Sequence, residues 1–459
     1  MPMRGGVLRF LPLGLALLCV QLDFFSLNLA LPVIADAVHS TVTDLQWLVS
    51  GYVLSLGAFL VPAGRIGDII GRRATLFIGL GVFAATSLVA GFATTSAVLI
   101  PTRIVQGLGA ALIMPTVFVI VSHTVVEDRR AKVVAFLLAV AGIGTATGPV
   151  VGGLFAQTIG WQWVFWINVP FAVVAGIGLL FLDDPRSPSA APAMDWWGLV
   201  TVVAGLALLS IGIDRIPETG WLSPTALPLV VGGVVVLGLF AWIESRTVAP
   251  LVRPALFGIR PYRFLLLLGF VCNGALNVLV YLAAIDLQVV DGFSATTAGM
   301  LFVPGSIGVA ISGPVGGWLC GRFAPSAVLA VAAVCGGGSL ALAALSPSLW
   351  AFLLALGVAG CACGLGYSVA QAGVQTAVPV SHASEANSFL LMTLIALGGI
   401  VVVTAANVTE ALSPTDVPSA GAIDAALYGT AALLVVAGVV AGLTLRRVRP
   451  AGAADPSLA

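Results

Sequence analysis

Hydrophobic residues occur in long blocks along the chain, and short charged or Pro/Gly-rich segments separate the blocks. Several blocks reach the roughly 20 residues that an α-helix needs to cross a bilayer. The pattern predicts fourteen membrane-spanning helices, at residues 9–32, 46–66, 74–93, 97–121, 132–155, 163–182, 197–214, 226–243, 263–288, 297–320, 326–345, 349–369, 388–408 and 423–445.

The composition agrees with a membrane protein. Of the 459 residues, 59% are hydrophobic and 8% are charged, whereas a soluble domain carries about 25% charged residues. The formal net charge is zero, so nothing favours a nucleic-acid partner. The segment 8–22 resembles a signal peptide, with Arg4 and Arg9 near an apolar stretch. Because that stretch continues past Asp23 to Pro32, we interpret it as an uncleaved first span.

The basic residues predict the orientation of the chain. An even number of spans places both termini on one side, and the positive-inside rule identifies that side. With a cytoplasmic N-terminus, all nineteen Lys and Arg residues except Arg103 and Arg215 fall in cytoplasmic segments. We therefore predict a multi-pass protein of the inner (plasma) membrane with both termini in the cytoplasm.

A glycine-rich, charged motif stands between the second and third predicted spans. It reads Gly64-Arg65-Ile66-Gly67-Asp68-Ile69-Ile70-Gly71-Arg72-Arg73 and resembles the G-x-x-x-D-x-x-G-R-R/K loop of the major facilitator superfamily. The resemblance implies a conformational latch, in which glycines allow close helix ends and the acid pairs with an Arg or a helix N-terminus. A basic turn that only fixes topology is the alternative. The latch would comprise Gly64, Gly67, Asp68, Gly71, Arg72 and Arg73.

The fourth predicted span carries Arg103-Ile104-Val105-Gln106-Gly107-Leu108-Gly109-Ala110-Ala111, which is similar to the R-x-x-x-G-x-x-x-A motif of the same superfamily. An arginine within hydrocarbon is costly and needs a partner or an aqueous cavity. Arg103 could instead extend to the outer surface, since it lies near the outer end of its span.

The fifth span contains Gly142-Ile143-Gly144-Thr145-Ala146-Thr147-Gly148-Pro149-Val150-Val151-Gly152-Gly153. It resembles the G-x-x-x-G-P-x-x-G-G signature of antiporters in the superfamily. Small residues four apart let helices touch, and a proline bends its helix. Generic helix packing explains the glycines almost as well. The residues assigned to the antiporter motif are Gly144, Gly148, Pro149, Gly152 and Gly153.

The first span, Leu22-Asp23-Phe24-Phe25-Ser26-Leu27-Asn28-Leu29-Ala30-Leu31-Pro32, is similar to the L-D-x-T-I-V-N-V-A-L-P stretch of fourteen-span drug:proton antiporters. Segments 46–52, 160–170 and 195–198 resemble that family as well. The resemblance implies an all-α membrane protein with the major facilitator fold. Two six-helix bundles, at 1–182 and 263–459, would flank a linker, 183–262, that holds two inserted helices. Phe24 and Phe25 stand where that family usually has a Thr after the acidic residue. We therefore expect the polarity of the cavity to differ from that of the family.

Buried acids are the candidates for proton coupling. Asp23 lies near the middle of its span, where burial favours the protonated carboxyl over an unpaired carboxylate. A static salt bridge between Asp23 and Arg103, at compatible depths, is the competing interpretation. Asp286, near the outer end of the ninth span, is a second candidate, although it could simply face the outer vestibule.

These motifs predict a proton-coupled antiporter that exports hydrophobic, drug-like molecules by alternating access. The chain has no Walker loop, so the proton gradient would supply the energy. A dedicated exporter of one endogenous metabolite or lipid precursor is the alternative. We expect no enzymatic activity and no bound metal or cofactor. The predicted partners are a small-molecule substrate, protons and the lipid bilayer. A monomer is expected to be sufficient for transport. The candidate cavity residues are Phe24, Phe25, Asn28, Tyr52, Asn277, Tyr281 and Phe302.

Overall fold

Helices lie at each of the predicted spans in the computed structural model, and no strand occurs in the segments that it describes. Among the described residues, twelve helices are long and apolar enough to cross a membrane. Two shorter apolar stretches, Trp163–Leu179 and Glu385–Gly398, overlap the predicted spans 163–182 and 388–408, and the second lies within the longer helix Ala383–Leu412. The fourteen-span count therefore stays a prediction. The structure describes residues 7–40, 45, 47–182, 195–220, 222–248, 250–346, 348–379, 382–413 and 419–446.

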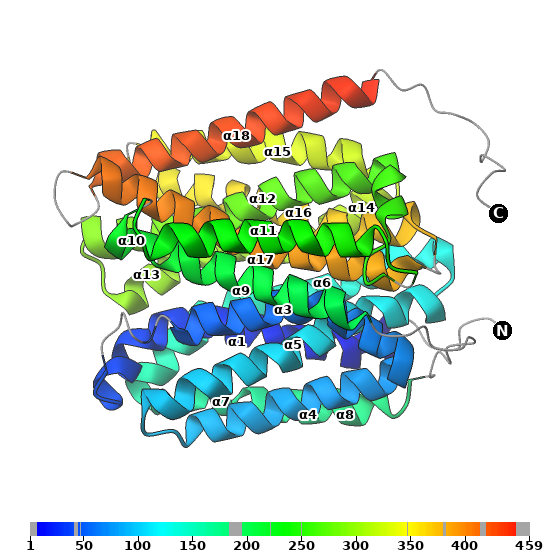
Figure 1. Ribbon diagram of the computed structural model, residues 1–459. Helices are drawn as coiled ribbons and strands as arrows, with labels where there is room; N and C mark the ends of the chain where they lie inside the picture. Colours follow the sequence, from blue (N-terminus) through cyan, green and yellow to red (C-terminus); the bar gives the residue numbers. More distant parts are fainter. Residues whose placement is uncertain are drawn as a thin grey trace.

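The first half of the chain forms one group of helices, in blue and cyan in Figure 1. Helix α1 packs against α6 and α8, α4 packs against α5 and α8, and α3 packs against α5. The elements are η1 (Val7–Phe10), α1 (Leu11–Ala37), α3 (Trp47–Ile70), α4 (Arg72–Gly91), α5 (Ser96–Thr124), α6 (Glu127–Thr158), α7 (Trp163–Trp166) and α8 (Asn168–Leu179).

The second half repeats this kind of packing. Helix α12 packs against α16 and α17, and α15 packs against α16 and α18. The start of α1 and the end of α18 lie at the same end of the bundle (Figure 1). The elements are α12 (Arg260–Ile285), the π-helix η3 (Asp286–Val290), α13 (Ala295–Leu301), α14 (Val303–Cys320), α15 (Pro325–Ala344), α16 (Leu349–Ala377), α17 (Ala383–Leu412) and α18 (Ala420–Arg446).

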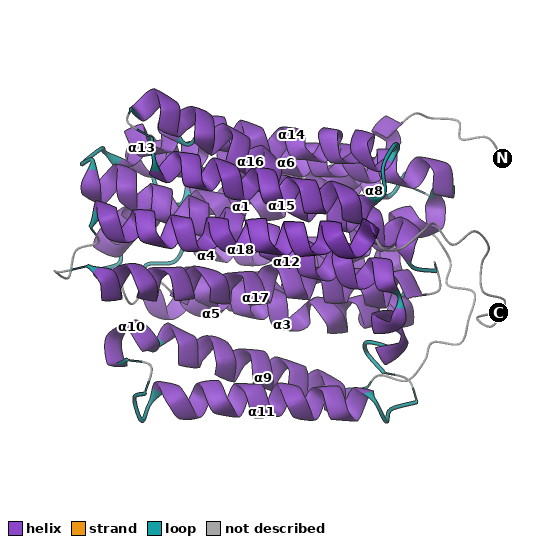
Figure 2. Ribbon diagram, turned by 90° about the horizontal axis from the view of Figure 1, so that it is seen from above, coloured by secondary structure: helices purple, strands orange, loops and turns teal. Residues whose placement is uncertain are grey.

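Between the halves, α9 (Trp196–Asp214) and α11 (Ala226–Glu244) form a hairpin along one side of the bundle (Figure 2). The short α10 (Ile216–Thr219) follows α9, and the 3-10 helix η2 (Pro254–Gly258) precedes α12. Glycine allows the close pairing of α9 with α11, because a Cβ atom on Gly205 would lie 2.8 Å from Leu237. Helix α9 also contacts α3 and α17, so the hairpin attaches to both halves.

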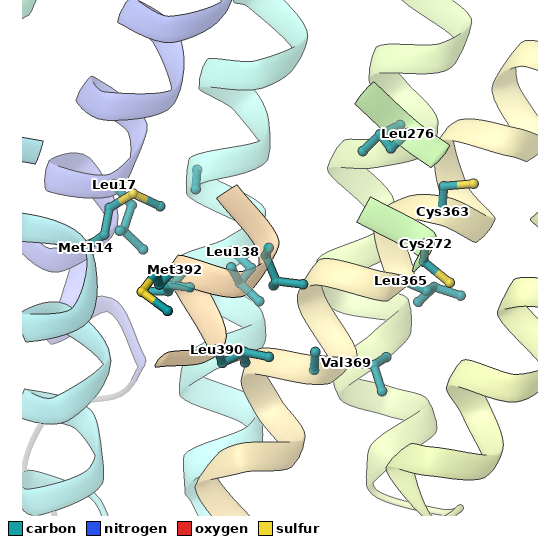
Figure 3. Close-up of a cluster of buried hydrophobic side chains, with 14 of the residues drawn as sticks. Leu17, Met114, Leu138, Cys272, Leu276, Cys363, Leu365, Val369, Leu390 and Met392 are labelled. Atoms are coloured by element: carbon teal, nitrogen blue, oxygen red, sulfur yellow. The ribbon is translucent and has the colours of Figure 1, made fainter. Parts of the chain in front are cut away.

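The two halves meet along two seams, α3 against α17 and α6 against α14. A Cβ atom on Gly57 would lie 2.7 Å from the Cβ atom of Ala396, and one on Gly142 would lie 2.8 Å from the Cα atom of Ala310. Apolar side chains from both halves belong to one buried cluster, which Figure 3 shows around Met114 of α5 and Met392 of α17. The seams therefore hold the halves in direct contact near the middle of the bundle.

Thiol labelling tests the predicted orientation. Two serines are replaced singly by cysteine in a variant of the protein that lacks the native cysteines. Ser346 follows α15 at a predicted outer loop, and Ser245 follows α11 at a predicted inner one. We expect an impermeant thiol reagent added to intact cells to label Ser346→Cys and to leave Ser245→Cys unlabelled, because the positive-inside rule places them on opposite sides. Labelling of only Ser245→Cys would reverse the orientation.

Candidate functional site

A buried ion pair joins α1 to α5. Arg103 Nη1 donates to Asp23 Oδ2 at 2.5 Å, and each side chain is 1% exposed. The other carboxylate oxygen, Oδ1, accepts hydrogen bonds from Gln106 Nε2 at 3.0 Å and from Asn168 Nδ2 at 2.7 Å. The Asp23 carboxylate is therefore satisfied by three donors from α5 and α8, which is what a buried charge requires.

Arg103 points into the protein rather than toward the outer surface. Its Nε donates to the backbone carbonyl oxygen of Leu48 at 3.0 Å, and Nη1 also donates to Gln106 Oε1 at 2.7 Å. The guanidinium carbon lies 4.2 Å from the centroid of the Tyr52 ring and 5.9 Å from that of Phe165. These cation–π contacts and hydrogen bonds provide the partners that an intramembrane arginine needs.

The glycines of the antiporter motif bring α6 against α1, the helix that carries Asp23. A Cβ atom on Gly144 would lie 2.6 Å from the carbonyl oxygen of Leu18, and one on Gly148 would lie 2.6 Å from the Cβ atom of Phe25. At Gly152 the added atom would collide with the carbonyl oxygen of Ser26. The motif thus provides close helix contact, while Pro149 and Gly153 occupy the same helix.

Substitution at Gly152 tests whether this contact matters. We expect Gly152→Ala to lower the melting temperature of the purified protein by several degrees and to reduce its yield, because the methyl group must push α1 away from α6. The matched control is Gly81→Ala in α4, where an added Cβ meets nothing within 4 Å. Alanine should be tolerated there, since it favours a helix more than glycine does. Equal melting temperatures for both variants would contradict the close contact.

A central cavity of about 490 Å³ lies between the two halves. Five of the predicted cavity residues line it: Phe24, Phe25, Tyr52, Asn277 and Tyr281. Phe302 is 9% exposed at the junction of α13 and α14 and is not among the described residues that line this cavity. Asn28 is also a predicted cavity residue, and its side chain lies outside the part of the structure that is described.

Tyr52 connects the cavity with the ion pair. Its ring stacks with Phe24 at a centroid distance of 6.2 Å and lies over the guanidinium of Arg103. Tyr52 also lines the cavity, whereas Asp23 and Arg103 lie behind it. The ring of Tyr52 therefore contacts both the cavity and the guanidinium of Arg103.

The inserted helix α9 also contributes to the cavity wall. Ser210, Ile211 and Ile213, near the end of α9 at Asp214, are among the lining residues. Helix α9 contacts α3 and α17, and these two helices approach each other closely at Gly57 and Ala396. The sequence offered only one signal of this role, the polar Ser210 within an apolar block.

The charged motif lies at the junction of α3 and α4, where Gly71 has a φ of 96° that favours glycine. Arg72 Nη2 donates to Asp68 Oδ1 at 3.1 Å, and Arg73 donates to the carbonyl oxygens of Leu180 and Leu182. Gly64 and Gly67 are buried in α3. The motif therefore ties the end of α3 to α4 and to the end of α8.

The same motif faces the first turn of α17 in the other half. Glu385 of that turn interacts electrostatically with Arg65 and Asp68 and forms an ion pair with Arg253, whose Nε lies 3.4 Å from Glu385 Oε1. Charges from α3, α17 and the segment before η2 thus meet at the predicted cytoplasmic end. Glu385 and Arg253 could not be identified as site residues from the sequence, because neither belongs to a motif.

Asp286 lies apart from the Asp23 cluster, at the start of η3. Its charged neighbours are Asp291 and Asp424, both acids. The two candidate acids therefore belong to different environments. Asp23 is buried and paired with a cation, whereas the partly exposed Asp286 is surrounded by like charge.

A larger apolar groove, of about 870 Å³, lies between α14, α15 and α16. Its walls include Ile307, Val331 and Leu354, all of which are largely exposed. Such a groove on the outside of a membrane bundle suits lipid acyl chains. It contains none of the predicted site residues.

A bundle of apolar helices in two halves, with a mostly apolar cavity between them that carries a few polar groups, is the architecture of a membrane transporter. The chain matches the family model of the Major Facilitator Superfamily over residues 13–403, so it belongs to this superfamily. That membership confirms the fold that the motifs predicted.

Among curated relatives, the chain is 31% identical over 362 residues to the tetracenomycin C resistance and export protein of Streptomyces glaucescens, a match covering 76% of this chain and 66% of the relative. It is 31% identical over 323 residues to the multidrug resistance protein Stp of Mycobacterium tuberculosis, covering 70% and 60%. The cephamycin export protein CmcT of Amycolatopsis lactamdurans is 35% identical over 300 residues, covering 64% and 61%. The matches thus span roughly two thirds or less of each relative.

Solved structures support the fold alone. The human organic anion transporter MFSD10 (TETRAN) superimposes with a TM-score of 0.65 at 16% identity, covering 95% of this chain and 98% of that one. The E. coli fucose:proton symporter FucP gives a TM-score of 0.62 at 17% identity, covering 96% and 98%. At such identities the substrates of these proteins say nothing about the present one.

Proposed function

We propose that this protein exports hydrophobic, drug-like or antibiotic-like small molecules in exchange for protons, by alternating access. The observation that carries the proposal is the buried Asp23–Arg103 ion pair placed directly behind Tyr52 in the wall of the central cavity. A titratable group so close to the cavity can respond to what the cavity holds.

Asp23 is the proposed coupling residue. Protonation of its carboxylate removes the negative charge that Arg103 neutralises, so the pair loses most of its attraction. Arg103 would then depend on Leu48, Gln106 and the ring of Tyr52. Because that ring lines the cavity, a change in the pair would alter the substrate site. Asp286 is a second, subsidiary candidate for proton transfer.

The charged motif is the proposed latch between the halves. Glu385 of α17 is attracted to Arg65 of α3 and repelled by Asp68, and the attraction to Arg65 must be given up if the halves rock apart at that end. We propose that this end is cytoplasmic and that both termini lie there, in the inner membrane. The halves would be 1–182 and 263–459, joined by 183–262, and a monomer would carry out transport.

The cavity favours an apolar substrate with few hydrogen-bonding groups. Aromatic side chains from α1, α3 and α12 line it, together with the amides of Asn273 and Asn277. An aromatic wall with a few polar groups binds flat hydrophobic molecules, including cations.

The names of the relatives favour two forms of this function. Stp is a multidrug resistance protein, whereas two others are named for the export of a single antibiotic, tetracenomycin C or cephamycin. A dedicated exporter of one compound is therefore the second candidate.

A drug-susceptibility panel in a host that lacks its main efflux pumps tests the proposal. We expect expression of the protein to raise the inhibitory concentrations of several unrelated hydrophobic drugs, and this gain should vanish when a protonophore collapses the gradient. Resistance to one compound alone would select the dedicated exporter. Resistance that persists with the protonophore would contradict proton coupling.

Substitution on the inserted helix tests the assigned cavity wall. We expect Ile211→Trp to change resistance unequally, with the largest substrates losing several-fold or more, because the indole occupies cavity volume. Val235→Trp on the exposed face of α11 is the matched control and should keep the wild-type profile. A wild-type profile for Ile211→Trp, at equal expression, would remove α9 from the substrate site.

A further inference from the structure

Two buried carboxylates lie where the ends of the inserted hairpin meet. Asp195 directly precedes α9 and Glu244 is the last residue of α11; the residues are 8% and 4% exposed. One oxygen of each is satisfied. Asp195 Oδ1 accepts a hydrogen bond from the backbone N–H of Gly198 at 2.9 Å, and Glu244 Oε2 accepts one from the N–H of Val252 at 2.9 Å.

The second oxygen of each carboxylate is buried and has no hydrogen-bond partner among the described residues. Both of these oxygens face the same small space beside Gly198. A Cβ atom at that glycine would lie 2.5 Å from Glu244 Oε1 and 2.7 Å from Asp195 Oδ2. Gly198 therefore leaves room for the two unpartnered oxygens to approach each other.

The charges around this space do not compensate two carboxylates. Among the described side chains, no basic group forms an ion pair with Asp195 or Glu244. The charged residues that act on Glu244 are Asp195 and Glu385, both acidic, and the nearby Arg253 is paired with Glu385. Two buried carboxylates without a cation cannot both stay ionised, since each raises the cost of the other.

We propose that Asp195 and Glu244 together bind one proton, which Asp195 Oδ2 and Glu244 Oε1 share as a carboxylic acid–carboxylate hydrogen bond. The proton comes from water at that end of the bundle, and the pair then carries one negative charge. A hydrogen bond to an ionised acceptor is roughly twice as strong as a neutral one. The site is separate from Asp23 and does not depend on the proposed transport.

A proton fits this space better than a metal ion does. Calcium takes about six to eight oxygen ligands and magnesium about six, whereas only two free oxygens face Gly198. The described residues contain no group of three or more His, Cys, Asp or Glu side chains that could hold a metal.

The bound proton would fasten three segments together. It joins the start of α9 to the end of α11, and Glu244 Oε2 extends the link to the buried Val252. The next residue, Arg253, is paired with Glu385 of α17. Loss of the proton would leave two like charges at the point where the hairpin attaches to the rest of the molecule.

Thermal unfolding of the purified protein in detergent, measured from acid to alkaline pH, tests the proposal. A proton held only in the folded pair stabilises the fold at low pH, and this contribution is lost as pH rises through the value at which the pair releases it. We expect the melting temperature of the wild type to fall by a few degrees on that rise. Glu244→Gln and Asp195→Asn should lose this step, because an amide donates to the remaining carboxylate at every pH.

The control is Asp36→Asn on the exposed end of α1, which should retain the step. Infrared difference spectra provide a second measurement, which needs no stability change. Raising the pH should remove one more protonated carboxyl band from the wild type and from Asp36→Asn than from Glu244→Gln. The proposal would be overturned if the wild type lacked that band, or if Glu244→Gln and Asp195→Asn kept the full fall in melting temperature with rising pH. Stabilisation of the wild type by Mg²⁺ or Ca²⁺ at alkaline pH would also overturn it, because it would indicate a metal site.

Discussion

An Asp23→Asn protein is expected to fold and to reach the membrane but to lose proton-driven efflux entirely. Asparagine keeps the size of the side chain and can still bond with Gln106 and Asn168, which hold Asp23 Oδ1 at 3.0 and 2.7 Å. It cannot take up or release a proton. If Asp23 couples substrate to protons, the substrate should still bind, and its affinity should no longer depend on pH.

Uptake of a fluorescent substrate into energised inverted vesicles provides the measurement. Asp23→Glu should keep some activity, since it retains a carboxylate, and Asp36→Asn near the exposed end of the same helix should behave as the wild type. An Asp23→Asn protein that still concentrates substrate against a gradient would show that another group carries the proton. Asp286 would be the next residue to test.

Removal of the cation should have the second large effect. Arg103→Ala leaves the Asp23 carboxylate buried without its charged partner, and breaking a buried pair in this way costs about 3–5 kcal/mol. The substitution also removes the donors to Leu48 and Gln106 and the stacking with Tyr52. We expect a strongly lowered melting temperature and no efflux.

A double variant separates the charge from the packing. Asp23→Asn combined with Arg103→Ala contains no uncompensated buried charge, so it should be more stable than Arg103→Ala alone. The measurement is the denaturation midpoint of the wild type, both single variants and the double variant in one detergent. Additive losses in the double variant would mean that the ion pair contributes nothing beyond the packing of its two side chains.

The sequence predicted the helices and offered the ion pair as one of two interpretations of Asp23, because both depend on local patterns. Each span follows from a continuous apolar block, and Asp23 and Arg103 stand out as charges within such blocks at matching depth. Their partners were harder to identify. Gln106 and Asn168 lie within quoted motifs, but their contact with Asp23 depends on the rotation of α5 and α8 about their axes.

Helix rotation also explains the mixed result for the cavity. Phe24, Phe25, Tyr52, Asn277 and Tyr281 line it, whereas Phe302 does not. An apolar block in a membrane bundle carries almost no amphipathic signal, because lipid and protein interior are both apolar. A residue can therefore be assigned to a span more readily than to a face of that span.

Several other contacts between distant segments could not be predicted from the sequence. No motif connects the parts of the chain that meet in these contacts. Glu385 approaches Arg65 and Arg253, and α9 forms part of the cavity wall. Asp195 meets Glu244 at Gly198. These contacts depend on how the inserted hairpin packs between the halves.

Proton release on substrate binding tests the central claim most directly. Substrate is added to purified protein in a weakly buffered detergent solution while the pH is recorded, and binding is measured in the same sample. Competition between proton and substrate requires that binding displace protons and that affinity fall as the pH drops. We predict release from the wild type and none from Asp23→Asn at equal substrate occupancy. Binding without release in the wild type, or equal release from both proteins, would contradict coupling through Asp23.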